Sequence, residues 1–344
     1  MTLADQEEHA GEARIGAARD LPIPPFKPRR RWIGGDLQTV RNFVTRPEIN
    51  LSPWPGKRLW LPVEGGDELA AALNGAEYIG QRPLIFLVHG LTGCEDSIYL
   101  RRTTREWLQR GYPVLRINLR GSKPSRPRCR DHYHAGRSED LRDALCRLIE
   151  MEPAVARTGI VTVGVSLGGN VLIKLLAEHG EELPIRAAAT VSAPIDLMAT
   201  SHRFHLPRNT LYHRWMLSNL KEEATARPAA LSEEERRAIE AARTLYQFDN
   251  TFVAPRHGFA DAEDYYTRCA GKRYLADVAV PLLAIHAADD PWIPGDAYSS
   301  FDWSRNTKLS ALLAASGGHV GFHAADDEAP WHDRAIMAFV DLAT

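Results

Sequence analysis

The junction at residues 160–172 constrains the fold of this chain more than any other stretch. It reads Ile-Val-Thr-Val-Gly-Val-Ser-Leu-Gly-Gly-Asn-Val-Leu, so a β-branched, strand-like run passes through a glycine-rich turn into a helix-like apolar pattern. A Gly-x-Ser-x-Gly turn between a strand and a helix is the setting of a nucleophile elbow, which holds its serine in a strained backbone position. Ser166 is therefore a candidate nucleophile, and a chance match of the pattern in an ordinary βα turn is the alternative.

Strand-like and helix-like segments alternate along most of the chain. Helical patterns begin near Asp96 and Ser138, and two short extended segments flank a hairpin turn at 64–67. This alternation predicts an α/β fold with a mostly parallel central sheet that is flanked by helices. Apolar runs typical of buried strands lie at 84–89, 114–118, 160–165, 187–192, 280–286 and 309–315.

A helical insertion is predicted where this alternation stops, because no convincing strand is found between about residues 196 and 275. The chain then divides into a flexible N-terminal arm (1–25), a first core part (26–195), a helical cap insertion (196–275) and a second core part (276–344). Aromatic side chains of the insertion could line an apolar pocket, but we expect most of them to pack within the insertion itself. They are Phe204, Tyr212, Trp215, Tyr246, Phe248, Phe252, Phe259, Tyr265 and Tyr266.

Composition argues against several classes of partner. The 42 basic and 44 acidic residues nearly balance at a net charge of −2, so no nucleic-acid-binding surface is expected. No run of about 18 consecutive apolar residues is present, so we expect no integral membrane segment. The start of the chain lacks a run of signal-peptide length, and the 4 cysteines are scattered without Cys-x-x-Cys spacing. These features favour a cytoplasmic protein.

A serine hydroxyl needs a base, and a group that orients the base, before it can attack at neutral pH. Both follow Ser166, in the order Ser, acid, His that is usual for an elbow of this kind. His319 comes after the last predicted strand and two glycines, which allow a close approach. The acid is Asp290 or its neighbour Asp289. We choose Asp290, because Asp290 and Pro294 have the Asp-x-x-x-Pro spacing that usually follows the acid strand in such folds.

The negatively charged oxygen of a tetrahedral intermediate needs two hydrogen-bond donors. We expect these oxyanion-hole donors to be the backbone N–H groups of Leu167, directly after the candidate nucleophile, and of Leu91, in the loop after the strand at 84–89. His132 and His134 lack a third clustered ligand, so no metal is expected. The chemistry of a serine, a histidine and an acid requires no cofactor.

The motifs together resemble the YheT-like branch of the α/β-hydrolase superfamily, which is related to the ABHD-type lipases and esterases. The resemblance implies that Ser166, Asp290 and His319 form a catalytic triad, and that the activity is hydrolysis of carboxylic esters such as short- to medium-chain acyl esters or monoacylglycerols. The start of the chain carries no apolar anchor, unlike the animal members, which favours a soluble, bacterial-type member. The matching pieces are Phe26-Lys27-Pro28, Leu37-Gln38-Thr39, His89-Gly90-Leu91-Thr92-Gly93, Asn118-Leu119-Arg120-Gly121, Tyr133-His134-Ala135-Gly136, Gly164-Val165-Ser166-Leu167-Gly168-Gly169-Asn170, Phe248-Asp249, His257-Gly258-Phe259, Tyr265-Tyr266, Asp289-Asp290-Pro291 and Gly317-Gly318-His319-Val320-Gly321-Phe322.

The sequence as a whole predicts an α/β-hydrolase fold with a helical cap, acting as a serine esterase on a small-molecule ester with an apolar acyl group. A thioesterase or an acyltransferase with the same triad shares the tetrahedral intermediate, so the sequence does not separate these activities. A hydrolase fold without catalytic activity, which binds an apolar ligand under the cap, is a further alternative.

Overall fold

A nine-stranded sheet forms the centre of the computed structural model, which describes residues 12–343. Within these residues the strand order is β1-β9-β8-β7-β6-β4-β5-β3-β2. The strands from β5 to β9 in this order are parallel, whereas β1 at one edge and β3 and β2 at the other pair antiparallel. The predicted α/β fold with a mostly parallel sheet is therefore confirmed. The strands are β1 (Ala13–Ile15), β2 (Lys57–Pro62), β3 (Glu68–Asn74), β4 (Leu84–Val88), β5 (Val114–Ile117), β6 (Ile160–Val165), β7 (Ile185–Val191), β8 (Leu282–Ala287) and β9 (Leu309–Ala314).

Strand β4 illustrates why the centre of the sheet forms. Every one of its residues is apolar and buried. Leu84, Phe86 and Val88 pack into one hydrophobic cluster, whereas Ile85 and Leu87 pack into a second. Successive side chains of a strand point to opposite faces, so a strand that is covered on both faces needs a continuous apolar run.

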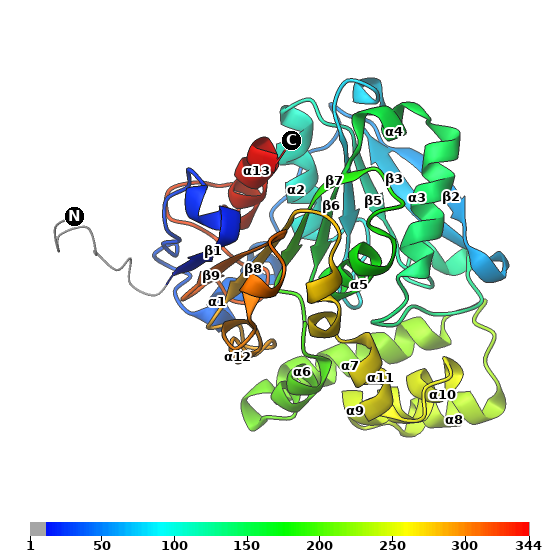
Figure 1. Cartoon of the computed structure of the whole chain (residues 1–344). Helices are drawn as coiled ribbons and strands as arrows, with labels where there is room; N and C mark the ends of the chain where they lie inside the picture. Colours follow the sequence, from blue (N-terminus) through cyan, green and yellow to red (C-terminus); the bar gives the residue numbers. More distant parts are fainter. Residues whose placement is uncertain (1–11, 344) are drawn as a thin grey trace.

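Helices cover both faces of this sheet (Figure 1). Helices α3, α4 and α5 lie on one face, where Leu145 and Leu172 join the first cluster. Helices α2 and α13 lie on the other face, where Trp107 and Trp331 join the second cluster. The core helices are α1 (Gly35–Thr45), α2 (Ile98–Gln109), α3 (Glu139–Met151), α4 (Ala154–Thr158), α5 (Leu167–His179), α12 (Asp296–Ser299) and α13 (Trp331–Ala343). Short 3-10 turns of the core are η1 (Gly16–Asp20), η2 (Glu64–Gly66), η3 (Ala76–Tyr78), η4 (Arg126–Arg128) and η9 (Trp303–Arg305).

The N-terminal segment differs from its prediction as a flexible arm over residues 1–25. From β1 onward it belongs to the folded core, because β1 pairs antiparallel with β9. Ala18 in η1 and Leu21 after it are buried. A strand of three residues is too short to show its own periodicity, so only the partner strand reveals it. Residues 1–11 lie outside the described part of the chain.

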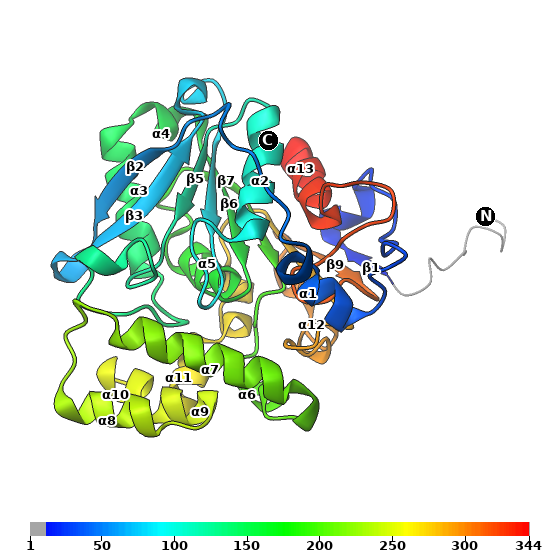
Figure 2. The same cartoon turned by 180° about the vertical axis from the view of Figure 1, so that it is seen from behind.

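Only helical elements occupy the described segment between β7 and β8, which is where the cap insertion is predicted. They form a layer on one side of the core, and Figure 2 shows α7 running along its boundary with the core. None of the helices within residues 12–343 is both long enough and apolar enough to cross a membrane. The cap elements are α6 (Leu197–Phe204), η5 (Pro207–Asn209), α7 (Thr210–Thr225), α8 (Glu233–Ala241), α9 (Leu245–Phe248), the π-helical turn η6 (Asp249–Val253), α10 (Ala254–Arg256), α11 (Ala262–Cys269), η7 (Gly271–Arg273) and η8 (Leu275–Asp277).

Candidate active site

Ser166 lies in the turn between β6 and α5, with φ 51° and ψ −125°. A residue other than glycine rarely adopts such a conformation, which costs about 1–3 kcal/mol and persists only where its surroundings hold it. The Ser166 N–H donates to the carbonyl of Val191 at 2.8 Å. A Cβ atom on Gly164 would lie 2.6 Å from the carbonyl oxygen of Gly168, and one on Gly168 would lie 2.4 Å from that of His89. The glycines thus allow the close contacts of a strand–turn–helix elbow.

His319 lies after β9 and reaches back to the elbow. Its Nε2 is 2.9 Å from Ser166 Oγ, and its Nδ1 is 2.8 Å from Asp290 Oδ2. The His319 side chain is only 4% exposed, and its backbone N–H donates to Thr39 Oγ1 of α1 at 2.8 Å. Residues from three separate strand ends therefore form one hydrogen-bonded row. The sequence predicts all three members of this row, whereas no sequence pattern indicates the contact with Thr39.

The two neighbouring carboxylates after β8 have different partners. Asp290 is fully buried, and its Oδ1 accepts the N–H groups of Trp292 at 2.8 Å and Ile293 at 2.9 Å. Burial opposes ionisation of Asp290, but the charge and hydrogen bond of His319 outweigh it and hold the pKa of the carboxyl below its ordinary value. Asp289 instead accepts the N–H of Gly318 at 2.8 Å, and burial raises its pKa. Of the pair, only Asp290 contacts the imidazole.

Leu91 and Leu167, whose backbone N–H groups are the predicted oxyanion donors, both line the cavity that Ser166 also lines. Neither group donates to a protein acceptor within the described residues. The loop that carries Leu91 packs closely against the elbow, because a Cβ atom on Gly90 would lie only 2.9 Å from Ser166 Cβ. Free donors beside the serine hydroxyl are what an oxyanion hole requires.

Tyr133 connects this loop to the cap, a link that the sequence analysis did not detect. Its hydroxyl accepts the N–H of Thr92 at 2.8 Å and donates to Glu223 Oε2 of α7 at 3.0 Å. Burial raises the pKa of Glu223 to about 7. The sequence around Tyr133 does not indicate these contacts, because Thr92 and Glu223 are far from it in the chain. Tyr133 thereby positions the residue next to Leu91.

Two cavities meet at Ser166. One has a volume of about 110 Å³, extends under the cap, and has Leu167 in its wall. The other has a volume of about 300 Å³, lies between α1, the start of α2 and α7, and has His319 in its wall. Most of the lining of both cavities is apolar. An extended molecule whose reactive carbon lies at Ser166 could therefore place one part in each cavity.

Cap aromatic residues contribute more to these walls than expected. Phe204, Phe248, Tyr265 and Tyr266 line the smaller cavity, and Trp215 lines the larger one. The first four are also buried members of the main hydrophobic cluster. The same rings therefore pack the cap and form the pocket wall, two roles that the sequence analysis treated as alternatives.

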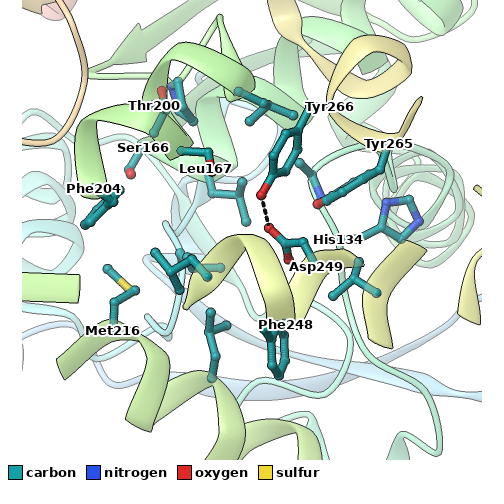
Figure 3. A pocket seen from close by; sticks show the side chains of 18 of the residues that line it. His134, Ser166, Leu167, Thr200, Phe204, Met216, Phe248, Asp249, Tyr265 and Tyr266 are labelled. Atoms are coloured by element: carbon teal, nitrogen blue, oxygen red, sulfur yellow. Dashed lines mark hydrogen bonds between the residues drawn. The ribbon is translucent and has the colours of Figure 1, made fainter. Parts of the chain in front are cut away.

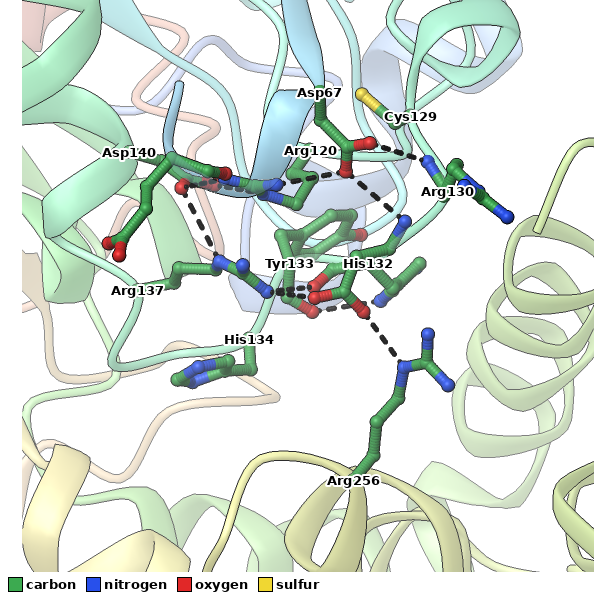
Figure 4. A network of polar contacts seen from close by, with 12 residues as sticks. Asp67, Arg120, Cys129, Arg130, His132, Tyr133, His134, Arg137, Asp140 and Arg256 are labelled. Carbon is green, nitrogen blue, oxygen red and sulfur yellow. Dashed lines mark hydrogen bonds and ion pairs between the residues drawn. The ribbon is translucent and has the colours of Figure 1, made fainter. Parts of the chain in front are cut away.

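A buried cluster of charges holds the loop between β5 and α3, which passes beside the smaller cavity (Figure 4). Arg120 is 2% exposed and donates to Asp67 at 2.9 Å and to Asp140 at 2.6 Å. Burial disfavours its charge, but the two carboxylates outweigh this and raise the pKa of Arg120 above its ordinary value. Further along the loop, Asp131 accepts from Arg137 at 2.6 Å and from Arg256 of the cap at 2.8 Å.

We expect Arg120→Met to destabilise the protein by about 3–5 kcal/mol, because it leaves the buried Asp67 without a cationic partner and Asp140 with only Arg137, at 3.4 Å. Arg147→Met is the matched control, since Arg147 pairs with Glu150 on the surface of α3, with side chains 49% and 64% exposed. Such a pair contributes about 0–1 kcal/mol. Urea denaturation of both variants measures the difference, and equal midpoints would contradict this role for Arg120.

Comparisons with known proteins identify the family and agree with the fold. Residues 83–325 match the family described as alpha/beta hydrolase fold. The protein named "Putative esterase YheT" of Escherichia coli (strain K12) is 33% identical over 300 residues, covering 86% of this chain and 86% of its own. "Phospholipase ABHD3" of Mus musculus is 28% identical over 253 residues, covering 72% of this chain and 61% of its own.

A solved structure gives the same fold. The esterase Pf2001 of Pyrococcus furiosus superposes with a TM-score of 0.61 at 17% identity, covering 85% of this chain and 92% of that one. At this identity the likeness concerns the fold alone. The family match over most of the chain, together with 33% identity to a relative along 86% of both lengths, shows that this protein belongs to the α/β-hydrolase fold family, in its YheT-like branch.

Proposed function

We propose that this carboxylic ester hydrolase cleaves short- to medium-chain acyl esters, monoacylglycerol-like esters among them, through an acyl-enzyme on Ser166. The names of its relatives, an esterase and a phospholipase, support an acyl ester as substrate. The observation that carries the proposal is the hydrogen-bonded row of Ser166, His319 and Asp290 at the junction of two largely apolar cavities.

In the proposed reaction, Ser166 Oγ attacks the ester carbonyl carbon while His319 Nε2 takes the hydroxyl proton. The carbonyl oxygen becomes negative and accepts hydrogen bonds from the N–H groups of Leu91 and Leu167. Asp290 accepts the hydrogen bond from Nδ1–H, so it fixes the imidazole tautomer and stabilises the imidazolium.

The intermediate then collapses. The bond to the alcohol oxygen breaks, and this oxygen leaves with the proton from His319. Water enters, gives a proton to His319, and adds to the acyl carbon of the acyl-enzyme. The second intermediate releases the carboxylic acid, and Ser166 regains its proton.

The cavities provide a place for each half of the ester. The leaving oxygen must be near His319, which lines the larger cavity and not the smaller one, so the alcohol part occupies the larger cavity. The acyl part then extends past Leu167 into the smaller cavity of about 110 Å³. Ligand pockets for drug-sized molecules measure roughly 300–1,000 Å³, so this volume favours short and medium acyl chains.

The test is covalent labelling followed by a substrate panel. A fluorophosphonate should label the purified full chain, with the modified peptide carrying Ser166. Hydrolysis of p-nitrophenyl esters from acetate to laurate should then show an optimum at short or medium chains, and monoacylglycerols should be cleaved. Matched acyl thioesters and an added alcohol acceptor measure the thioesterase and transferase activities.

Each alternative has its own outcome. No labelling and no turnover of any ester by the folded protein would contradict the proposal and favour a ligand-binding protein. Faster cleavage of thioesters than of matched esters would make it a thioesterase with the same machinery. Labelling at another serine would contradict the assignment of the nucleophile.

A further inference from the structure

One acidic side chain stands in the otherwise largely apolar wall of the smaller cavity. Asp249 is the first residue of the π-helical turn η6 and lines the cavity together with Ser166 (Figure 3). Its Oδ2 accepts a hydrogen bond from the Tyr266 hydroxyl at 2.6 Å. No other hydrogen bond reaches this carboxyl from the described residues, so Oδ1 keeps its bonding capacity unused in a side chain that lines the cavity.

Among residues 12–343, no charged partner compensates Asp249. Burial raises the pKa of its carboxyl to about 7, the hydrogen bond from Tyr266 opposes this rise only in part, and no cation contributes. The other titratable side chains that line the cavity are Tyr265 and Tyr266 of α11 and His132, Tyr133 and His134 of the loop before α3. Burial lowers the pKa of His132 to about 3. Burial holds the pKa of His134 well below its ordinary value, so that ring supplies no positive charge. The contrast is Asp290, which is fully buried and has three donors, whereas Asp249 is only partly buried and has one.

A structural role for Asp249 would explain only half of these contacts. Anchoring Tyr266 needs one carboxyl oxygen, and an apolar side chain would fill the wall without the cost of an unpaired polar atom. Single π-helical turns within helices are also frequent at functional sites. A carboxyl that keeps one oxygen free inside an apolar cavity is suited to bind a polar group that arrives with the ligand.

We propose that Asp249 determines acyl specificity, by selecting acyl chains that carry a hydroxyl group able to hydrogen-bond to its free oxygen. The proposal rests on the proposed function, in which the acyl part enters this cavity because His319 lines the other one. A hydroxyl fits the carboxyl in either protonation state, since it donates to a carboxylate and accepts from a carboxylic acid. An unsubstituted chain leaves Asp249 desolvated and unpaired, so the site rejects it.

The experiment uses p-nitrophenyl esters of straight-chain C4 to C10 acids, each with and without a single hydroxyl at successive positions. For the wild type, one position should raise kcat/KM by about 10- to 100-fold over the unsubstituted ester of the same length. Asp249→Leu should abolish this ratio, by slowing the hydroxylated ester and accelerating the unsubstituted one. Asp249→Asn keeps a donor and an acceptor at nearly the same volume, so it should retain part of the preference.

Asp277→Leu is the matched control, because Asp277 is exposed at the end of η8 and is absent from both cavities. This variant should keep the wild-type ratio. Equal kcat/KM for both ester series at every hydroxyl position, or an unchanged ratio in Asp249→Leu or Asp249→Asn that matches Asp277→Leu, would overturn the proposal. Thermal melts show whether each variant folds. If Asp249→Leu does not fold, the ratio of the wild type and that of Asp249→Asn test the proposal.

Failure of this inference is distinguishable from failure of the proposed function. A wild type that is labelled by a fluorophosphonate and cleaves both ester series equally retains the proposed function and loses only the role of Asp249. A wild type that is neither labelled nor active on any ester loses both.

Discussion

Replacing Ser166 with alanine should lower kcat on every ester that the wild type cleaves by about 10⁴- to 10⁶-fold. The variant has no side-chain oxygen to form the acyl-enzyme. His319 can then only assist the direct attack of a water molecule, which the site does not hold in place as it holds the serine hydroxyl. Alanine retains Cβ and the same backbone, so the elbow and the free energy of unfolding should change little. Steady-state kinetics at saturating p-nitrophenyl ester measure kcat, and a thermal melt checks that the stability of the fold is unchanged.

Ser299→Ala provides the control for this experiment. Ser299 is exposed at the end of α12 and lines neither cavity, so its loss should leave kcat and fluorophosphonate labelling at wild-type values. If Ser166→Ala were folded and still turned over substrate at the wild-type rate, the nucleophile would lie elsewhere and the proposed mechanism would be wrong.

Asp290→Asn should lower kcat by about 10⁴-fold, which is the second-largest effect that we expect. The carboxylate accepts from the Nδ1–H of His319 at 2.8 Å, and this bond places the unprotonated Nε2 toward Ser166. An amide in its place stabilises the opposite tautomer and does not offset the positive charge that the imidazole gains during attack. Binding of the ester should change far less than kcat, because Asp290 lies behind His319 and lines neither cavity.

The substitution Asp289→Asn at the neighbouring position distinguishes the role of Asp289 from that of Asp290. Asp289 accepts the backbone N–H of Gly318, in the loop before His319, at 2.8 Å, and an amide oxygen can accept the same bond. We therefore expect its kcat to fall by less than about tenfold. The reverse order of effects, with Asp289→Asn the more damaging, would show that the acid had been assigned to the wrong position.

Much of the fold and the identity of the candidate triad could be predicted from local patterns. The apolar run of β4 follows directly from a strand buried on both faces, and the elbow follows from glycines at 164 and 168 that permit close contacts. Ser166, Asp290 and His319 could be selected because each lies just after a predicted strand in a known order. Their catalytic roles, and the oxyanion donors Leu91 and Leu167, stay predictions until the variants are measured.

What the sequence by itself determined is therefore what depends on neighbouring residues: strand periodicity, the steric demand of the elbow and the order of the chemical groups. Only the tertiary structure decided which distant groups meet. It pairs β1 with β9, joins Tyr133 to Glu223 of the cap, and places Asp249 in the cavity wall with one oxygen that accepts no hydrogen bond from the described residues. These contacts depend on packing between segments far apart in the chain, and no local pattern of residues encodes that packing.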